Sequence, residues 1–381
     1  MELTRENYNE TAKELLTFLQ NSPSCFHAVK NVVDMLTAAG FTEVKEEESW
    51  KLEAGGRYFV TRNQSSVIAF KVPGKDFKGF QIIASHSDSP TFKIKENPEM
   101  RVENAYTKLN VEGYGGMLMA PWFDRPLSVA GRVVVRREGS LKEELVNIDR
   151  DLVMIPSLAI HMNREANKGV SYNPQKDLLP LLGCGDSKPE FLKIVAEEIK
   201  VKEEDILAHD LFLYNRMEGT IWGADREFVS APRLDDLQCA FASMEGMLAG
   251  KHEESIAVHC VLDNEEVGSG TKQGAASTFL KDTLRRINDG LGRTYEEYLM
   301  TLAGSFMISA DNAHALHPNS GEAGSCFYAA LTFLIFDHTV SSLCLPITSS
   351  TALSTLCAGR ELMSMALPLM GNRLVLNLLG S

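Results

Sequence analysis

Two adjacent glutamates, Glu265 and Glu266, stand shortly after the uncharged run of residues 256–262. Such a run is typical of a strand buried on both faces of a parallel sheet. Because neighbouring side chains leave the backbone in different directions, one carboxylate can bind a metal ion while the other acts as a general base toward water. For a Glu-Glu pair taken alone, a solvated acidic loop is the plainer interpretation. Other segments of the chain must therefore show whether the pair belongs to a metal site.

Two further apolar runs also end at residues able to bind a metal. Residues 80–85 lead into His86, and residues 306–310 lead into Asp311. Asp235 stands at a loop-to-helix junction, where a carboxylate favoured by the helix dipole is the alternative interpretation. In open α/β sheets, ligands gather beyond the carboxyl ends of the strands. The coincidence therefore predicts a metal site at one edge of a sheet.

The predicted ligands comprise one imidazole and several carboxylates, without a thiolate. This combination suits zinc, cobalt or manganese in a catalytic role. A carboxylate that bridges two ions about 3.5 to 4 Å apart is usual in two-metal hydrolases. Asp88, two residues after His86, is placed to hydrogen-bond the imidazole and to fix its tautomer.

The segments around these residues have the pattern of an α/β domain. Apolar residues recur at helical spacing over residues 8–20, and a second helix is predicted with Ser22 as its cap and Pro23 in its first turn. Strands separated by turns with Gly and Lys are predicted at residues 58–61, 66–72 and 80–85.

Residues 91–219 have a different pattern, with short alternating runs and turns rich in Pro and Gly. This predicts a β-rich module inserted into an α/β domain that is made of residues 1–90 and 220–381. Within the module, His161 follows an apolar, strand-like run. Alone, it is interpreted as a structural histidine.

Composition narrows the function classes. The chain has 381 residues and a formal net charge of −13, so neither nucleic acid nor an anionic membrane is an expected partner. Its seven cysteines show no C-x-x-C spacing, which argues against a zinc knuckle and a disulfide scaffold. There is no signal-peptide pattern, and the apolar run 326–336 is too short to span a bilayer as a helix. These features predict a cytoplasmic protein.

Four blocks of the chain resemble the signatures of the aspartyl aminopeptidase family of dinuclear metallopeptidases. They are His-Ser-Asp at 86–88, Pro-Arg-Leu-Asp at 232–235, Asp-Asn-Glu-Glu-Val-Gly-Ser at 263–269, and Ser-Ala-Asp-Asn-Ala-His-Ala-Leu-His-Pro-Asn at 309–319. The similarity runs in order up to about residue 319. It implies a zinc-peptidase-like α/β fold, with a mixed central sheet flanked by helices and residues 91–219 as an inserted dimerisation domain.

The resemblance also implies a site. His86, Asp235 and Asp311 would hold the first ion, with Asp235 bridging to a second ion that Glu266 holds. Glu265 would be the general base. Such an enzyme uses two zinc ions and a metal-activated water to remove the N-terminal residue of a peptide, with acidic residues (Asp or Glu) preferred.

The same resemblance implies a homo-oligomer in which dimers assemble into a shell of twelve subunits. His161 would then bind substrate in the active site of a neighbouring subunit. This role replaces the structural interpretation of that histidine.

The resemblance ends near residue 320. The family continues with a basic substrate-binding segment, a Gly-Ser-Thr loop and a Met-His-Ser-x-Arg-Glu block whose histidine completes the second metal site, and none is recognisable here. Residues 321–381 contain five charged residues, which suggests a frameshifted or replaced tail. Cys357 or His338 could stand in for the missing ligand, although a buried apolar cysteine is the plainer interpretation of Cys357. The rival prediction is therefore a catalytically inactive homologue, truncated or frameshifted, that keeps the scaffold without the second metal site.

Overall fold

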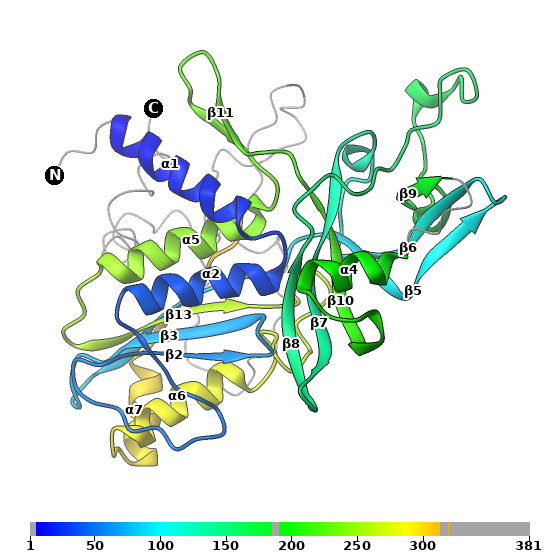
Figure 1. The fold of residues 1–381 in the computed structure, drawn as a ribbon. Coiled ribbons are helices and arrows are strands. Elements are labelled where there is room, and N and C mark those ends of the chain that lie inside the picture. Colours follow the sequence, from blue (N-terminus) through cyan, green and yellow to red (C-terminus); the bar gives the residue numbers. More distant parts are fainter. Residues whose placement is uncertain (1–4, 185–189, 313–318, 320–381) are drawn as a thin grey trace. The chain divides into compact units, whose positions relative to one another are not determined.

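The structure, a computed structural model, describes residues 5–184, 190–312 and 319. These residues belong to two compact units (Figure 1). Unit 1 contains the described residues up to Asp88 and from Thr220 onward, and unit 2 is Ser89–Gly219. Within the described ranges, no helix combines the length and the apolar character needed to cross a membrane.

Unit 1 is built on a mixed six-stranded sheet in the order β1-β2-β3-β13-β4-β14. The β2–β3 and β3–β13 pairs are antiparallel, whereas β13–β4 and β4–β14 are parallel. The predicted strands are confirmed with small shifts of their ends, as is the mixed α/β fold. The bounds are β1 (Thr42–Glu43), β2 (Arg57–Arg62), β3 (Ser66–Lys71), β4 (Gly79–His86), β13 (Ser255–Leu262) and β14 (Phe306–Ser309).

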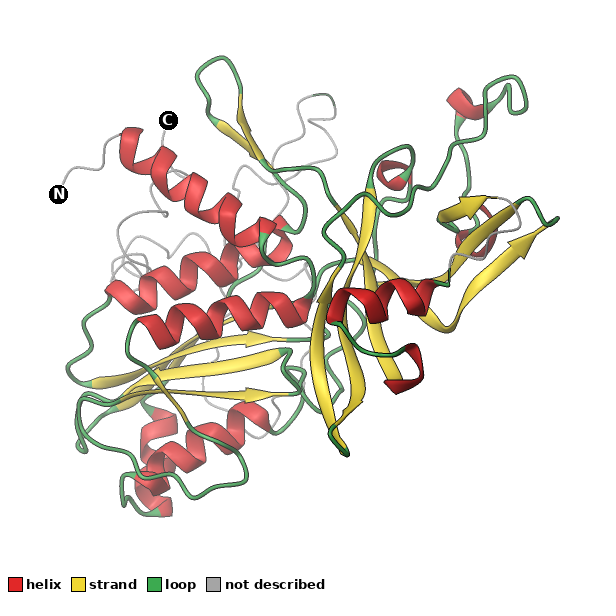
Figure 2. Ribbon diagram, in the orientation of Figure 1, coloured by secondary structure: helices red, strands yellow, loops and turns green. Residues whose placement is uncertain are grey.

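Helices cover both faces of this sheet (Figure 2). One face packs against α1 (Arg5–Gln20), α2 (Cys25–Ala38) and α5 (Leu234–Ala249), and the other against α6 (Phe279–Gly290) and α7 (Tyr295–Ala303). Because side chains alternate along a strand, Val67 and Ala69 of β3 enter the first core while Ile68 and Phe70 enter the second. A short hairpin of β11 (Thr220–Trp222) and β12 (Phe228–Ser230) completes unit 1.

The second helix begins later than its sequence predicts. Ser24, not Ser22, occupies the N-cap position of α2. The Ser22 hydroxyl donates to the Phe18 carbonyl oxygen at 2.7 Å and accepts from Asn31 Nδ2 at 2.9 Å. Ser22 therefore satisfies a carbonyl at the end of α1, and the prediction that it caps α2 is wrong.

Unit 2 contains a six-stranded antiparallel sheet in the order β8-β7-β10-β5-β6-β9. The strands are β5 (Thr91–Val102), β6 (Tyr106–Tyr114), β7 (Leu127–Arg137), β8 (Ser140–Asn147), β9 (Leu181–Cys184) and β10 (Ile206–Asn215). The helices are α3 (Pro174–Asp177), α4 (Phe191–Ile199) and the short η1 (Ala120–Trp122), η2 (Ala166–Lys168) and η3 (Glu203–Asp205). Phe191 and Val195 of α4 join the buried core of this sheet.

The topology of unit 1 brings three strand ends to one edge. Strands β13, β4 and β14 run parallel, with Leu262 opposite His86 and Ser309 opposite Ala84. The residues that follow these strands therefore emerge side by side. This is the edge at which the sequence predicts a metal site.

Candidate metal centre

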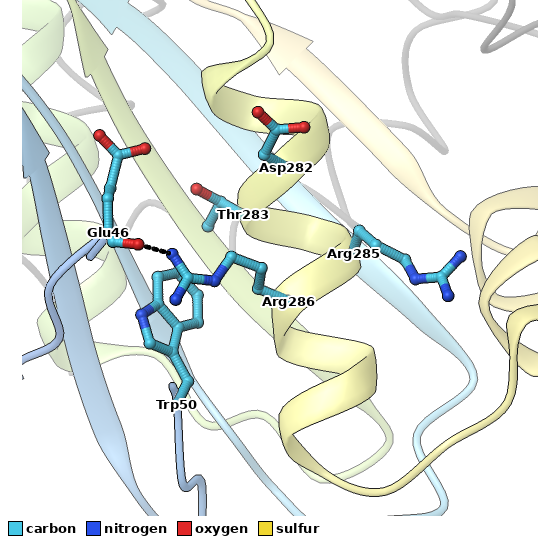
Figure 3. Close-up of a pocket in the computed structure, with 6 residues that line it drawn as sticks. All are labelled: Glu46, Trp50, Asp282, Thr283, Arg285 and Arg286. Carbon is cyan, nitrogen blue, oxygen red and sulfur yellow. Dashed lines mark hydrogen bonds between the residues drawn. The ribbon is translucent and has the colours of Figure 1, made fainter. Parts of the chain in front are cut away.

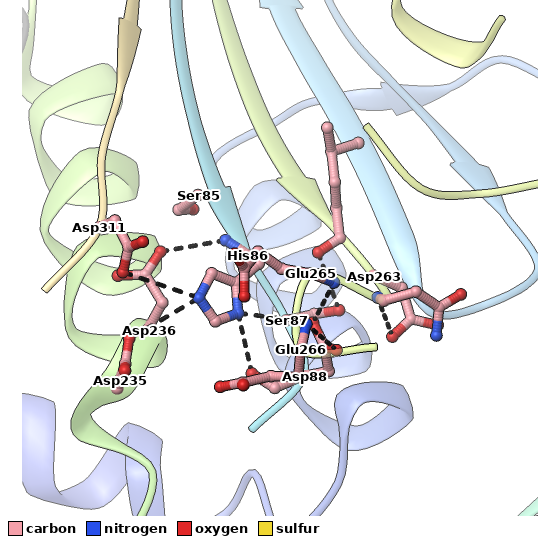
Figure 4. Close-up of polar contacts among 12 residues, drawn as sticks. Ser85, His86, Ser87, Asp88, Asp235, Asp236, Asp263, Glu265, Glu266 and Asp311 are labelled. Atoms are coloured by element: carbon pink, nitrogen blue, oxygen red, sulfur yellow. Dashed lines mark hydrogen bonds and ion pairs between the residues drawn. The ribbon is translucent and has the colours of Figure 1, made fainter. Parts of the chain in front are cut away.

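His86 is the last residue of β4 and lies at the middle of the site (Figure 4). Its side chain is buried, with its Nδ1 atom 3.0 Å from the backbone oxygen of Asp88. A carbonyl oxygen only accepts hydrogen bonds, so Nδ1 carries the proton and the Nε2 of a neutral ring has a free lone pair. Nε2 lies 3.7 Å from Asp235 Oδ1 and 3.9 Å from Asp311 Oδ1.

The two aspartates at the start of α5 are held in non-helical conformations. Asp235 has φ −82° and ψ 113°, and a cis peptide bond joins it to Asp236. Asp236 is fully buried, and its Oδ2 accepts the backbone N–H of His86 at 3.1 Å. This contact ties the start of α5 to the end of β4. Sequence reasoning missed Asp236, for which the only signal was its place beside Asp235.

Asp88 anchors the loop that carries the glutamate pair. Its Oδ1 accepts the backbone N–H of Glu265 at 3.1 Å, and its Oδ2 accepts that of Glu266 at 3.2 Å. The same Oδ1 lies 3.4 Å from His86 Nδ1. Asp88 thus lies against the imidazole, although its backbone oxygen and not its carboxylate is the nearer acceptor for Nδ1. It also positions the two glutamates, which the sequence did not indicate.

The charges of these groups perturb one another strongly. Burial favours neutral His86, but the carboxylates of Asp235, Asp311 and Asp88 outweigh it and raise the pKa of the imidazole well above its usual value. Burial raises the pKa of Glu266 to about 8, and the neighbouring Asp88 carboxylate adds to the rise. A site that concentrates this much negative charge favours a bound cation.

The side chains present fit a zinc ion. Ligand atoms of His86, Asp235, Asp236 and Asp311 lie within 4.8 Å of one another, as do those of His86, Glu265 and Glu266. Ligands around a tetrahedral zinc, with bonds of about 2.0–2.2 Å, lie about 3.3–3.6 Å apart. Distances of 3.7 and 3.9 Å from His86 Nε2 therefore require only small shifts of the side chains. One imidazole with carboxylate oxygens is also a donor set that zinc accepts.

His161 belongs to unit 2, where it lies in an exposed turn. By contrast, the described residues that make up the candidate metal centre all belong to unit 1. The distances within the candidate metal centre therefore do not test the predicted role of His161 in a neighbouring subunit.

A pocket of about 340 Å³ lies elsewhere on unit 1 (Figure 3). Its two guanidinium groups are already engaged. Arg286 Nη1 donates to the Glu46 backbone oxygen at 2.8 Å and the group stacks on Trp50, while Arg285 pairs with Asp289. These contacts explain the residues as structural, so the metal centre remains the candidate functional site. The pocket is lined by Glu46, Trp50, Asp282, Thr283, Arg285 and Arg286.

Comparison with known proteins places this chain in a family. A sequence model described as aminopeptidase I zinc metalloprotease (M18) matches residues 18–325. The chain belongs to the M18 aminopeptidase family. A probable M18 family aminopeptidase 2 from Clostridium acetobutylicum is 49% identical over 326 residues, which cover 83% of this chain and 75% of that protein. The resemblance found in the sequence motifs is thereby confirmed.

Solved M18 structures share the fold. The structure of Chaetomium thermophilum mApe1 matches with a TM-score of 0.77 and 31% identity, over 84% of this chain and 78% of that chain. The S. cerevisiae mApe1 dodecamer matches with a TM-score of 0.74 and 27% identity, over 86% and 77%. These matches confirm the zinc-peptidase-like fold of the M18 chain. The predicted departure from the family after residue 320, including Cys357 and His338, lies outside the described residues.

Proposed function

We propose that this chain is a zinc aminopeptidase that removes the N-terminal residue of peptides. His86, Asp235 and Asp311 would hold one ion, and Glu266 with the bridging Asp235 would hold a second. Cobalt or manganese would suit the same donors. The observation that carries the proposal is the convergence of His86, Asp311 and the pair Glu265 and Glu266 at one sheet edge, with their ligand atoms within 4.8 Å in two groups that share the imidazole.

Glu265 is assigned the proton transfers. Bound zinc would polarise the attacking water and the scissile carbonyl. Glu265 would accept a proton from the water as its oxygen bonds to the carbonyl carbon, and would pass that proton to the amine nitrogen as the C–N bond breaks. Burial raises the pKa of Glu265, which brings the group closer to neutral pH, as suits an acid–base residue. Asp88 would hold Glu265 in place through its backbone amide.

We further propose that the chain works in the cytoplasm as a homo-oligomer, with unit 2 as its dimerisation domain and His161 reaching the active site of a neighbouring subunit. The dodecamer formed by S. cerevisiae mApe1 supports this arrangement. So does the turn around His161, where Leu158, Ile160 and Met162 are 58%, 47% and 70% exposed. Exposed apolar side chains in one segment favour contact with a partner. An acidic N-terminal residue is the preferred substrate in this proposal.

A Glu265→Gln variant tests the proposal. The amide keeps the size of the side chain but cannot accept the proton, so turnover should fall by about 10²–10⁴-fold while bound zinc stays constant. Glu253→Gln, which makes the same change at an exposed position, is the matched control and should behave as the parent. Equal turnover in Glu265→Gln and the parent would exclude Glu265 as the base.

The second candidate is a catalytically inactive homologue that keeps the scaffold. The observation that favours it is that the family match ends at residue 325, near the start of the tail (residues 321–381) that is poor in charged residues. A purified chain that binds one ion or none, and that hydrolyses no peptide with added zinc, cobalt or manganese, would establish this alternative.

A further inference from the structure

The loop of residues 263–274 carries the glutamate pair and is held together by its own side chains. Gln273 Nε2 donates to Asn264 Oδ1 at 2.8 Å and to Asp263 Oδ2 at 3.2 Å. Thr271 Oγ1 donates to the same Asn264 Oδ1 at 2.8 Å. The two residues just before Glu265 are thus bonded to the far end of the loop.

A single hydroxyl joins both ends of this loop to the sheet. Ser66, the first residue of β3, is fully buried. Its Oγ donates to the Gln273 backbone oxygen at 2.9 Å and accepts the Asp263 N–H, also at 2.9 Å. The Gln273 side chain therefore starts from a fixed backbone position, which limits the places that its amide group can reach.

Asn264 sets the direction in which the chain leaves the strand. Its φ of 66° lies in the left-handed region, where asparagine is tolerated better than most residues. This conformation turns the chain between the buried end of β13 and Glu265. Because Gln273 and Thr271 both donate to the Asn264 side chain, they stabilise the turn that orients the glutamates.

We propose that Gln273 is a positioning residue for the Glu265 and Glu266 pair, acting through Asn264 and Asp263. The inference rests on the function proposed above and extends it to a residue outside the groups of potential metal ligands. Asp88 holds the amides of the two glutamates, and Gln273 holds the two residues before them. A primary amide suits this role because it supplies two N–H donors to two acceptors.

Two substitutions of Gln273 test whether its hydrogen bonds, and not only the size of its side chain, are needed. Gln273→Met keeps the length but removes both donors, whereas Gln273→Glu places a carboxylate against the Asp263 carboxylate. Lys272→Met is the matched control, because Lys272 lies in the same loop with an exposed side chain. Supporting partners of this kind typically contribute about 10–100-fold in metal affinity or activity. We therefore expect both Gln273 variants to lose about 10–100-fold in kcat and in the weaker of the zinc affinities, with KM unchanged.

The measurements are kcat and KM on a peptide with an N-terminal aspartate, and zinc binding by competition with a chelator. If Gln273→Met had the same kcat and zinc affinity as Lys272→Met, the inference would be overturned. If Gln273→Met does not fold, Gln273→Glu, which keeps the size of the side chain, is compared with Lys272→Met in the same two quantities. Values for Gln273→Glu equal to those of Lys272→Met would equally overturn the inference.

The failure of the proposed function can be told apart from the failure of this inference. If the parent binds zinc but hydrolyses no peptide, the proposed function fails, and the zinc affinity of Gln273→Met relative to Lys272→Met still decides whether Gln273 positions the pair. A parent chain that binds no zinc would overturn both.

Discussion

Replacing Asp88 with asparagine perturbs the contact that joins the imidazole to the glutamate loop. The Asp88 side chain is 2% exposed, and its two oxygens accept the amides of Glu265 and Glu266 at 3.1 and 3.2 Å. In Asp88→Asn one amide keeps a neutral oxygen as acceptor, while the other faces an NH₂ group and loses its hydrogen bond. The shape of the side chain changes little, so the effect reports the hydrogen bonds.

The size of the effect follows from these two bonds. A hydrogen bond to a charged group contributes about 1.5–3 kcal/mol and a neutral one about 0.5–1.5 kcal/mol. Losing one charged bond and weakening the other costs about 2–4 kcal/mol. Removal of the Asp88 charge also relieves its repulsion of Asp263 and Glu266, whose pKa values it helps to raise. The expected net loss is about 2 kcal/mol in the free energy of unfolding.

Urea unfolding of the metal-free chain measures this loss. Asp76→Asn is the control, because it makes the same substitution at an exposed position, where the change should stay within about 0.5 kcal/mol. If Asp88→Asn were as stable as Asp76→Asn, the two hydrogen bonds from the backbone amides would not hold the loop, and Asp88 would not position the glutamates.

Two further predictions concern unit 1. Burial lowers the pKa of His259 from 6.5 to about 4. Between these pH values the unfolded chain binds a proton at His259 that the folded chain does not bind, so the free energy of unfolding decreases as the pH falls from 6.5 toward 4. The expected loss is about 2 kcal/mol at pH 5. His259→Gln should lack this part of the pH dependence in urea unfolding, and equal pH dependence in variant and parent would contradict it. A Cβ at Gly274 would collide with the Ser269 backbone oxygen, so Gly274→Ala should reduce the free energy of unfolding by about 1–3 kcal/mol and lower Tm. A Cβ at Gly270 would meet nothing within 4 Å, so Gly270→Ala is the control. Equal Tm values for the Gly274→Ala and Gly270→Ala variants would contradict that prediction.

The convergence of the strand ends could be predicted from the sequence because it depends on local patterns. An uncharged run followed at once by His86, by Asp263 or by Asp311 indicates a buried strand and the residue at its end. Parallel pairing of β13, β4 and β14 then brings these residues together. The physical reason for the cluster is therefore already contained in the apolar runs.

The contacts that position these residues could not be predicted in the same way. Asp88 is far in sequence from the glutamates whose backbone N–H groups donate to it, and Ser66 is also far from Gln273. Such contacts depend on which strands become neighbours. The error at Ser22 has a different, local origin, because its hydroxyl donates to the carbonyl oxygen of Phe18 in the preceding helix instead of capping the following one.

The most direct test of the metal centre is the zinc content per chain of the purified protein, measured together with hydrolysis of peptides that begin with aspartate or leucine. The proposed site predicts two zinc ions per chain and turnover that is faster on the aspartyl peptide. One ion or none, with no hydrolysis of either peptide, would contradict the proposal that this edge of the sheet is a working aminopeptidase centre.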